Sequence, residues 1–375
     1  MSRRFILIFA CLMLLIGPAQ AAIETAVVRS EAHSFRVVTL LDGLEHPWSI
    51  TFLPDGRWLI TERPGRLRIV ESGRLLPKPV AGLPPIHRQG QGGLLDIALH
   101  PEYASNGWIY LSYAAPGDAG AGTEVLRGRL VGDRMTDVRS IFRMQPKLDS
   151  PLHFGGRLAF DRAGDLYITL GDRGRMAAAQ DLGNHLGSVV RLHDDGRIPK
   201  DNPFVGQAGA RAEIYSYGHR NIQGAARHPV TGALWSHEHG PQGGDEINIL
   251  RAGVNHGWPV ITYGVNYGSG TSIGEGRRKA GMAQPLYQWT PSIAPSGMAF
   301  YDAAAFPRWR GNLLVGALKF QMLVRLTLDG ERVVGEERLL EGIGRIRDVR
   351  VGPDGLIYLL TDEANGRLLR LEPVR

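Results

Sequence analysis

Six copies of one short unit constrain the fold of this chain more than any other feature of its sequence. The unit is an apolar strand, a turn and a second apolar strand, and in the clearest copies the turn is Pro-Asp-Gly or a relative of it. Two of these copies continue through another turn into a third strand. The six copies lie at residues 50–70, 95–112, 158–172, 225–236, 297–316 and 349–371.

Strand units that recur every 50 to 70 residues or so are typical of a β-propeller, in which each blade buries its faces against its neighbours. We therefore expect an all-β fold, a six-bladed β-propeller of four-stranded antiparallel blades, because a β-sandwich would not repeat the unit six times. The 49 glycines and 23 prolines are scattered singly, which suits tight turns, and helical periodicity is nearly absent. Residues 22–375 are expected to form one propeller domain, with its core at about residues 35–373.

The first residues resemble an export signal. Two arginines are followed by 13 apolar residues, 5–17, which are too few to cross a bilayer as a helix, and 19–22 offer an Ala-x-Ala cleavage pattern. We expect residues 1–21 to be a cleaved signal peptide and the protein to be periplasmic or secreted, with a helical membrane anchor as the alternative. Cys11 is the only cysteine, so the mature chain would lack thiol catalysis, disulfides and zinc-thiolate sites.

The charge of the chain excludes some partners. The formal net charge is +6, and the charges are mixed along the sequence with no basic run, which argues against nucleic acid. No later segment approaches 18 uninterrupted apolar residues, so stable membrane insertion is not expected. A small ligand with several negative charges could still use a local cluster of arginine and lysine.

Two loops before predicted strands contain candidate residues. Residues 88–94 form a glycine-rich loop, which alone is more often a plain turn than a site. His153 stands just before a strand in 152–158, at a position from which propeller channels are lined. A single histidine is usually structural, although imidazole is the commonest general base near neutral pH.

Two further segments are more specific. In 217–224, Arg220 and Asn221 offer donors suited to a carbonyl or carboxylate. In 236–248, a Gly-Pro turn can present successive backbone carbonyls beside Asp245 and Glu246, a set of hard oxygen ligands that fits Ca²⁺. The rival interpretation, zinc on the two histidines of this segment, has no third ligand.

Three cations lie toward the C-terminus. Lys319 stands in 316–320, and Arg345 and Arg347 stand in 344–348. Alternate residues of one strand point to the same face, so both arginines can point at one ligand. Alone, they would more often be surface arginines.

Several strings of this chain resemble the soluble PQQ-dependent glucose/sorbosone dehydrogenase family, and specifically its aldose sugar dehydrogenase branch. The resemblance runs over nearly the whole mature chain, and the strings occur in family order. They are His46-Pro-Trp48, residues 90–95, 153–158, 199–203 and 218–221, residues 239–241 with 245–248, and residues 345–349.

The resemblance implies a function: oxidation of aldose sugars at the anomeric carbon to lactones, with pyrroloquinoline quinone (PQQ) and Ca²⁺ as cofactors. His153 would match the general base that takes the hydroxyl proton while hydride leaves for the quinone, and Arg220 would polarise the quinone carbonyl. The implied cofactor-binding residues are Gln91, which would also lie near the sugar hydroxyl, with Arg220, Asn221, Lys319, Arg345 and Arg347. The implied metal ligands are the carbonyls of Gly240 and Pro241 for the catalytic calcium, and Glu246 for a second, structural calcium.

The chain departs from the glucose-preferring members of that family. They carry an Asp before the base where this chain has Leu152, so the group that orients His153 is left open. They carry a glutamine where this chain has His239, and their long insertions are missing here. Broad aldose specificity, a monomer and an unidentified electron acceptor are therefore hypotheses.

Two other functions remain open because propellers serve many functions. One is a calcium-dependent lactonase or other hydrolase, which would not need Lys319, Arg345 and Arg347. The other is a non-enzymatic carbohydrate-binding propeller, in which Arg220 and His153 would have no task.

Overall fold

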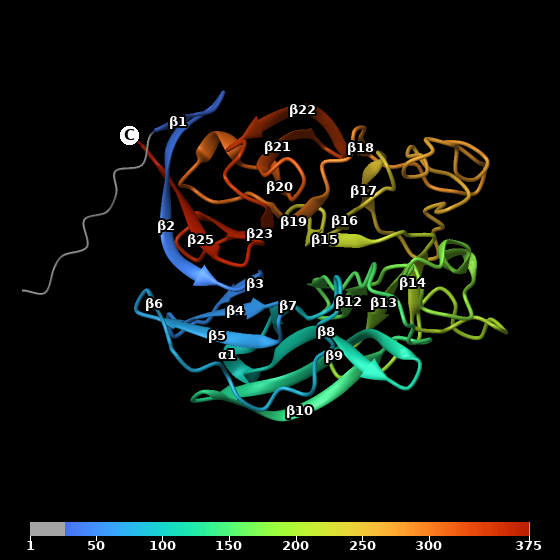
Figure 1. The fold of residues 1–375 in the computed structure, drawn as a ribbon, viewed down its shortest axis with the longest axis horizontal. Helices are drawn as coiled ribbons and strands as arrows, with labels where there is room; N and C mark the ends of the chain where they lie inside the picture. Colours follow the sequence, from blue (N-terminus) through green and yellow to red (C-terminus); the bar gives the residue numbers. More distant parts are fainter. Residues whose placement is uncertain (1–26, 375) are drawn as a thin grey trace, which may run out of the picture.

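The structure of the protein is a computed structural model that describes residues 27–374. The predicted signal peptide, 1–21, lies outside the described residues. Six antiparallel sheets are arranged around a central axis (Figure 1), which confirms the predicted six-bladed propeller. Between residues 27 and 374, no helix is long and apolar enough to cross a membrane.

The first five blades each consist of four consecutive strands. The first and second are β3 (Pro47–Phe52), β4 (Trp58–Glu62), β5 (Arg66–Glu71) and β6 (Arg74–Leu75), then β7 (Leu94–Leu99), β8 (Ile109–Gly117), β9 (Gly120–Val131) and β10 (Arg134–Arg143). The third is β11 (Leu158–Phe160), β12 (Leu166–Thr169), β13 (Ser188–Leu192) and β14 (Ile214–Tyr217). The fourth and fifth are β15 (Ile222–Arg227), β16 (Leu234–Glu238), β17 (Asp245–Ile249) and β18 (Tyr287–Trp289), then β19 (Pro295–Phe300), β20 (Leu313–Ala317), β21 (Met322–Asp329) and β22 (Arg332–Leu339).

The sixth blade closes the ring with strands from both ends of the described chain. It contains β23 (Ile346–Val351), β24 (Ile357–Thr361) and β25 (Gly366–Pro373), and β2 (Ser34–Leu44) pairs with β25. The short β1 (Val28–Arg29) adds a fifth strand to this blade, which the prediction of four-stranded blades did not include. The short helices are α1 (Tyr103–Asn106), η1 (Met176–Gln180) and η2 (Pro307–Trp309).

The innermost strand of each blade is its first in the repeat, and these six strands contact one another in turn around the axis. Part of the channel between them is filled by buried charges. Arg157, which is 1% exposed, donates from Nη1 to Asp96 at 3.1 Å and to Asp348 at 2.9 Å. Inner strands of three blades are thereby held by one guanidinium group.

The core between the last two blades depends on large aromatic side chains. Trp309 is fully buried and stacks on Phe306 with ring centroids 4.7 Å apart, and Phe35 from β2 meets its edge at 5.6 Å. We expect Trp309→Ala to destabilise the protein by about 3 kcal/mol because it leaves a cavity that this packing cannot fill. The midpoint of denaturant unfolding measures the loss, and Val334→Ala, at a 58% exposed position, serves as the control. Equal midpoints for the two variants would contradict this account of the core.

Candidate active site

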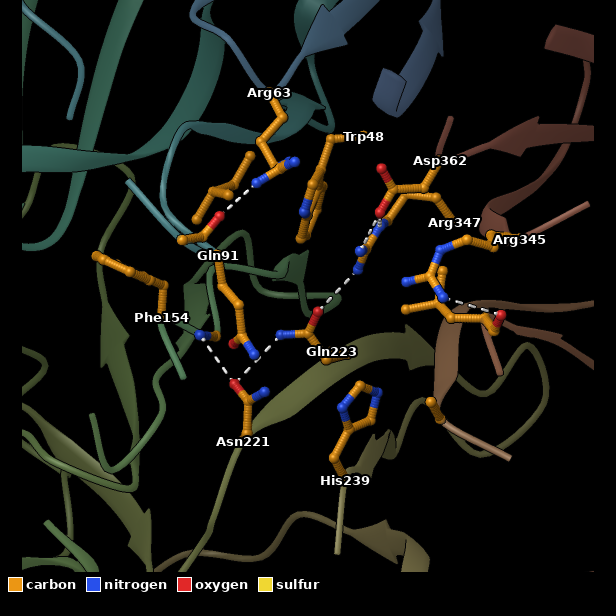
Figure 2. A pocket seen from close by; sticks show the side chains of 15 residues that line it. Trp48, Arg63, Gln91, Phe154, Asn221, Gln223, His239, Arg345, Arg347 and Asp362 are labelled. Atoms are coloured by element: carbon orange, nitrogen blue, oxygen red, sulfur yellow. Dashed lines mark hydrogen bonds and ion pairs between the residues drawn. The ribbon is translucent and has the colours of Figure 1, made fainter. Parts of the chain in front are cut away.

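A cavity of about 240 Å³ lies on the propeller axis, lined by side chains from around the ring (Figure 2). Four residues expected to bind the cofactor line it: Gln91, Asn221, Arg345 and Arg347. The sequence analysis assigned no role to five other polar or aromatic lining residues, which are Trp48, Arg63, Phe154, Gln223 and Asp362.

A second cavity of about 570 Å³ adjoins the first, since His239 and Ala294 line both. Three residues expected at the site line this second cavity, namely Gly240, Pro241 and Lys319. A third, much smaller space beside them is lined by Arg220 and Glu246. Every predicted site residue except His153 thus lines one of three neighbouring spaces.

His153 lies beside the first cavity, and its backbone N–H donates to the Gln91 side chain at 2.8 Å. Its Nδ1 is 2.6 Å from a carboxylate oxygen of Asp172, and the other oxygen of Asp172 accepts the indole N–H of Trp258 at 2.8 Å. Because an ionised carboxylate only accepts hydrogen bonds, the imidazole carries its proton on Nδ1 and leaves the Nε2 lone pair free. Burial lowers the pKa of His153, against the opposing effect of the Asp172 carboxylate, so the ring is neutral at neutral pH.

Asp172 is the group that orients His153, which the sequence left open. Leu152, the neighbour of the histidine, is 42% exposed and cannot orient the ring. Asp172 closes the third copy of the repeat, where it had the appearance of an ordinary residue in the turn after β12. It comes to His153 because Gly171, between β12 and Asp172, lies against the His153 backbone: a Cβ there would be 2.1 Å from the His153 carbonyl oxygen.

Arg220 is held by the last residue of β16 and by the residue that follows it. Its Nη1 donates to the His239 carbonyl at 3.1 Å, and its backbone N–H donates to the buried Glu238 carboxylate at 2.6 Å. The guanidinium carbon lies 5.5 Å from the ring centroid of Trp258, whose N–H binds Asp172. Trp258 therefore connects the arginine with the carboxylate that orients His153.

The charges around the cavities are strongly unbalanced. Arg347 forms an ion pair with Asp362 at 2.5 Å, and this pairing outweighs burial and lowers the pKa of Asp362. Within residues 27–374, four other cations of this region form no ion pair: Arg63, Arg220, Lys319 and Arg345. Such a group of unpaired charges suits a ligand that carries several carboxylates.

Glycines allow the tight turn at Gly240 and Pro241, in the segment 236–248 that offers oxygen ligands. A Cβ on Gly240 would lie 2.2 Å from the Gly243 carbonyl oxygen, and the Gly240 N–H donates to Asp245 at 2.9 Å. The carbonyl of Pro241 accepts the Tyr267 hydroxyl at 3.0 Å. These contacts fix a tight turn whose residues Gly240 and Pro241 line the second cavity.

Glu246 lies next to a second buried carboxylate, Glu238. Burial and the charge of Glu238 raise the pKa of Glu246 to about 8. The Asn248 amide bridges the two carboxylates, at 3.2 Å from Glu238 and 3.3 Å from Glu246. Two facing carboxylates favour a cation or a shared proton between them.

The histidines of this segment do not converge on a metal. His237 is fully buried and its ring nitrogens have no hydrogen-bond partner among residues 27–374, whereas His239 places Nε2 2.8 Å from the Pro295 carbonyl oxygen. In the described part of the chain, no three His, Cys, Asp or Glu side chains gather in a metal-binding group. Zinc on these two histidines therefore has no geometric support.

Comparison with known proteins identifies the chain. Residues 44–370 match the family model described as glucose/sorbosone dehydrogenase. Aldose sugar dehydrogenase YliI of Escherichia coli (strain K12) is 50% identical over 344 residues, which cover 90% of this chain and 92% of that protein.

Solved structures agree with this match. The apo crystal structure of the aldose sugar dehydrogenase from Escherichia coli superposes with a TM-score of 0.88 at 49% identity and covers 91% of this chain and 100% of its own. The PQQ-bound form of the aldose sugar dehydrogenase from Streptomyces coelicolor gives 0.74 at 29% identity and covers 91% of this chain and 98% of its own.

The propeller, its cation-rich cavities and these relatives define a quinoprotein sugar dehydrogenase, an oxidoreductase that acts on small sugars. The chain belongs to the glucose/sorbosone dehydrogenase family.

Proposed function

We propose that the protein oxidises aldoses at the anomeric carbon to lactones, with PQQ and Ca²⁺ as its cofactors. The observation that carries this proposal is the group of unpaired cations beside a histidine whose Nε2 is free to accept a proton. A lactonase would need the histidine and a metal, but it would have no use for so many cations around these three neighbouring spaces. PQQ carries three carboxylates and two quinone carbonyls, and both kinds of group call for cationic donors.

The residues present fit such a group. Arg345 uses one guanidinium nitrogen on the Leu318 carbonyl at 3.3 Å and has further N–H groups for a carboxylate. The Asn221 oxygen is engaged by the Gly155 N–H at 3.2 Å and by Gln223 at 3.2 Å, so its amide N–H groups are available to a ligand. Lys319 and Arg347 would hold further carboxylate or carbonyl oxygens of the cofactor.

When bound, the quinone with its calcium supplies a hydride acceptor, and the protein binds, orients and moves the proton. His153 would take the proton of the anomeric hydroxyl at Nε2 as the hydrogen on that carbon departs with its electron pair. Asp172 keeps the His153 proton on Nδ1 and stabilises the imidazolium that forms. Arg220 would donate to the carbonyl oxygen on which negative charge develops.

The Gly240 and Pro241 carbonyls would hold the catalytic calcium, since hard oxygen ligands are those that Ca²⁺ prefers. Glu246 would hold the second, structural calcium, and Glu238 beside it adds the negative charge that such an ion needs. Two carboxylates with a bridging amide support this assignment, because among residues 27–374 Glu246 has no ion pair and Glu238 has only the His219 imidazole, at 2.8 Å.

The proposed oxidation of aldoses has consequences for the substrate range and for the location of the protein. Gln91 would meet a sugar hydroxyl, and the cavity mouth without long insertions favours broad aldose specificity. We propose a monomer that acts in the periplasm or outside the cell and passes electrons to an acceptor that is still to be identified. The apolar residues 5–17 support export.

The test is dye-linked oxidation of glucose and other aldoses by the purified apoprotein, with PQQ and Ca²⁺ added separately and together. Activity is expected only when both are present. If no sugar is oxidised and PQQ shows no tight binding in a titration, the proposal is wrong, and hydrolysis of sugar lactones is the next assay. Size-exclusion chromatography with light scattering tests the monomer.

A further inference from the structure

Arg63 is a cation at the cavity to which the family resemblance assigns no role. It follows β4 in the first blade and lines the same cavity as Arg345 and Arg347. The residues proposed to hold the cofactor come mainly from blades four to six. Arg63 lies in the first blade, across the ring from the fourth, and Figure 2 shows it near Trp48 with its guanidinium group toward the loop that carries Gln91.

The contacts of Arg63 leave most of its donors unused. One Nη1 hydrogen bond goes to the Gly90 carbonyl, and Nε is buried without a partner. Within the described chain no carboxylate forms an ion pair with it, although a guanidinium group has five N–H donors. The Asp362 carboxylate is near enough for the charge of Arg63 to help lower its pKa, but that carboxylate is paired with Arg347. A partly buried positive charge whose only acceptor is a neutral carbonyl is costly unless a bound anion completes its contacts.

The backbone holds this side chain in place. The Arg63 carbonyl accepts the Leu94 N–H at 3.1 Å, and a Cβ on Gly93 would lie 2.1 Å from that same oxygen. The Arg63 N–H donates to the His46 carbonyl at 2.9 Å. A guanidinium group fixed at both the backbone and the side chain is arranged in advance for a planar anion.

We propose that Arg63 is a carboxylate-binding residue of the active-site cavity. The inference rests on the proposed function and extends it to a further wall of the cavity. The carboxylate can belong to the quinone, as an additional cofactor contact, or to a uronic acid, a sugar that carries its own carboxylate. In the second case Arg63 lies beside Gln91, the residue proposed to meet the sugar, and would give the enzyme activity on acidic sugars.

The decisive variant is Arg63→Gln, because glutamine keeps an N–H donor for the Gly90 carbonyl and removes the charge. Arg63→Lys keeps the charge. As a control, Arg88→Gln removes an exposed charge from the loop that carries Gly90. Three quantities are measured for each: calorimetric affinity for PQQ with Ca²⁺, calorimetric affinity for a benzene tricarboxylate, and kcat/KM for glucuronate and for glucose. Circular dichroism of each variant verifies the fold.

We expect Arg63→Gln to lower the affinity for PQQ, the affinity for the benzene tricarboxylate or kcat/KM for glucuronate by about tenfold or more. Arg63→Lys should recover much of that loss, and Arg88→Gln should match the wild type. Weaker PQQ binding assigns the carboxylate to the quinone. Unchanged PQQ affinity, with kcat/KM lowered for glucuronate but not for glucose, assigns it to the sugar.

Two results would overturn the inference. One is an Arg63→Gln variant that equals the wild type in all three measurements. The other is an equal loss of activity on both sugars with unchanged affinity for PQQ and for the tricarboxylate, which would make Arg63 only a support of the Gly90 loop. If the wild type itself binds no PQQ, the proposed function fails, and the benzene tricarboxylate titration alone then decides the role of Arg63.

Discussion

His153→Ala is expected to lower kcat for glucose by about 10²- to 10⁴-fold, the usual contribution of a general base, while PQQ affinity stays close to that of the wild type. The physical reason is the position of the side chain. Its Nδ1 is committed to Asp172 at 2.6 Å, its Nε2 is free, and it does not line the cavity that the cofactor would occupy. Stopped-flow reduction of the PQQ-loaded protein by glucose measures the step that the base assists, in which the sugar is oxidised and the bound quinone is reduced.

The chain offers a matched control for this experiment. His193 has the same arrangement on another part of the ring, with its Nδ1 2.7 Å from a carboxylate oxygen of Asp165, and it lines none of the three active-site spaces. His193→Ala should leave turnover unchanged, because it removes a histidine-carboxylate pair without touching the site. Near-native turnover in His153→Ala would refute its assignment as the base.

Asp172→Asn is the second variant with a large expected effect, a loss of roughly 10²- to 10⁴-fold in kcat, the scale reached when an orienting carboxylate is lost in other His–Asp pairs. The carboxylate accepts from both the His153 Nδ1–H and the Trp258 indole N–H. An asparagine side chain has one oxygen and one NH₂ group, so it cannot accept both hydrogen bonds. If its NH₂ group faces His153, the ring proton moves to Nε2 and the base is lost.

The pH profile separates this role from a merely structural one. Burial lowers the pKa of His153 below its ordinary value of 6.5, so wild-type kcat/KM should rise with pH through a pKa below 6.5 and level off near neutral pH. Asp172 acts in the opposite direction and raises the pKa, so removing its charge should move the acid limb to lower pH. Asp165→Asn serves as the control, and an unmoved acid limb in Asp172→Asn would show that Asp172 does not act through His153.

Most of the fold could be predicted because the first strands of each blade are adjacent in the sequence. An apolar strand, a Pro-Asp-Gly turn and a second apolar strand are contiguous in the sequence, and all six copies became the first two strands of a blade. The fifth strand of the last blade could not be predicted in the same way. Residues 28–29 pair with 34–35 in a short hairpin that has no repeat to mark it.

The site was predictable where residues share a segment and unpredictable where they meet only through the ring. Arg220 and Asn221, or Gly240 and Pro241, stand together in short polar runs that exceed the needs of a turn. Asp172, Trp258 and Arg63 are single residues at strand ends or in loops, with no polar run to mark them. Asp172 meets His153 across the β11–β12 hairpin of its own blade, whereas Trp258 reaches Asp172 and Arg220 from the loop between β17 and β18, in the next blade.

The closure of the ring also dictates an order of assembly. Blades one to five are each complete within a contiguous stretch, so each can form as soon as that stretch has been synthesised. The sixth blade cannot form so early, because β2 pairs with β25, near the other end of the chain. Val37, for example, pairs with Leu371. Until the ribosome has made residues 366–373, the apolar edges of the first and fifth blades stay uncovered, and the loop-closure entropy of the longest contact is still to be overcome. A circular permutant opened between β6 and β7, with the present ends joined near β1 and β25, would turn this last step into the formation of a local hairpin.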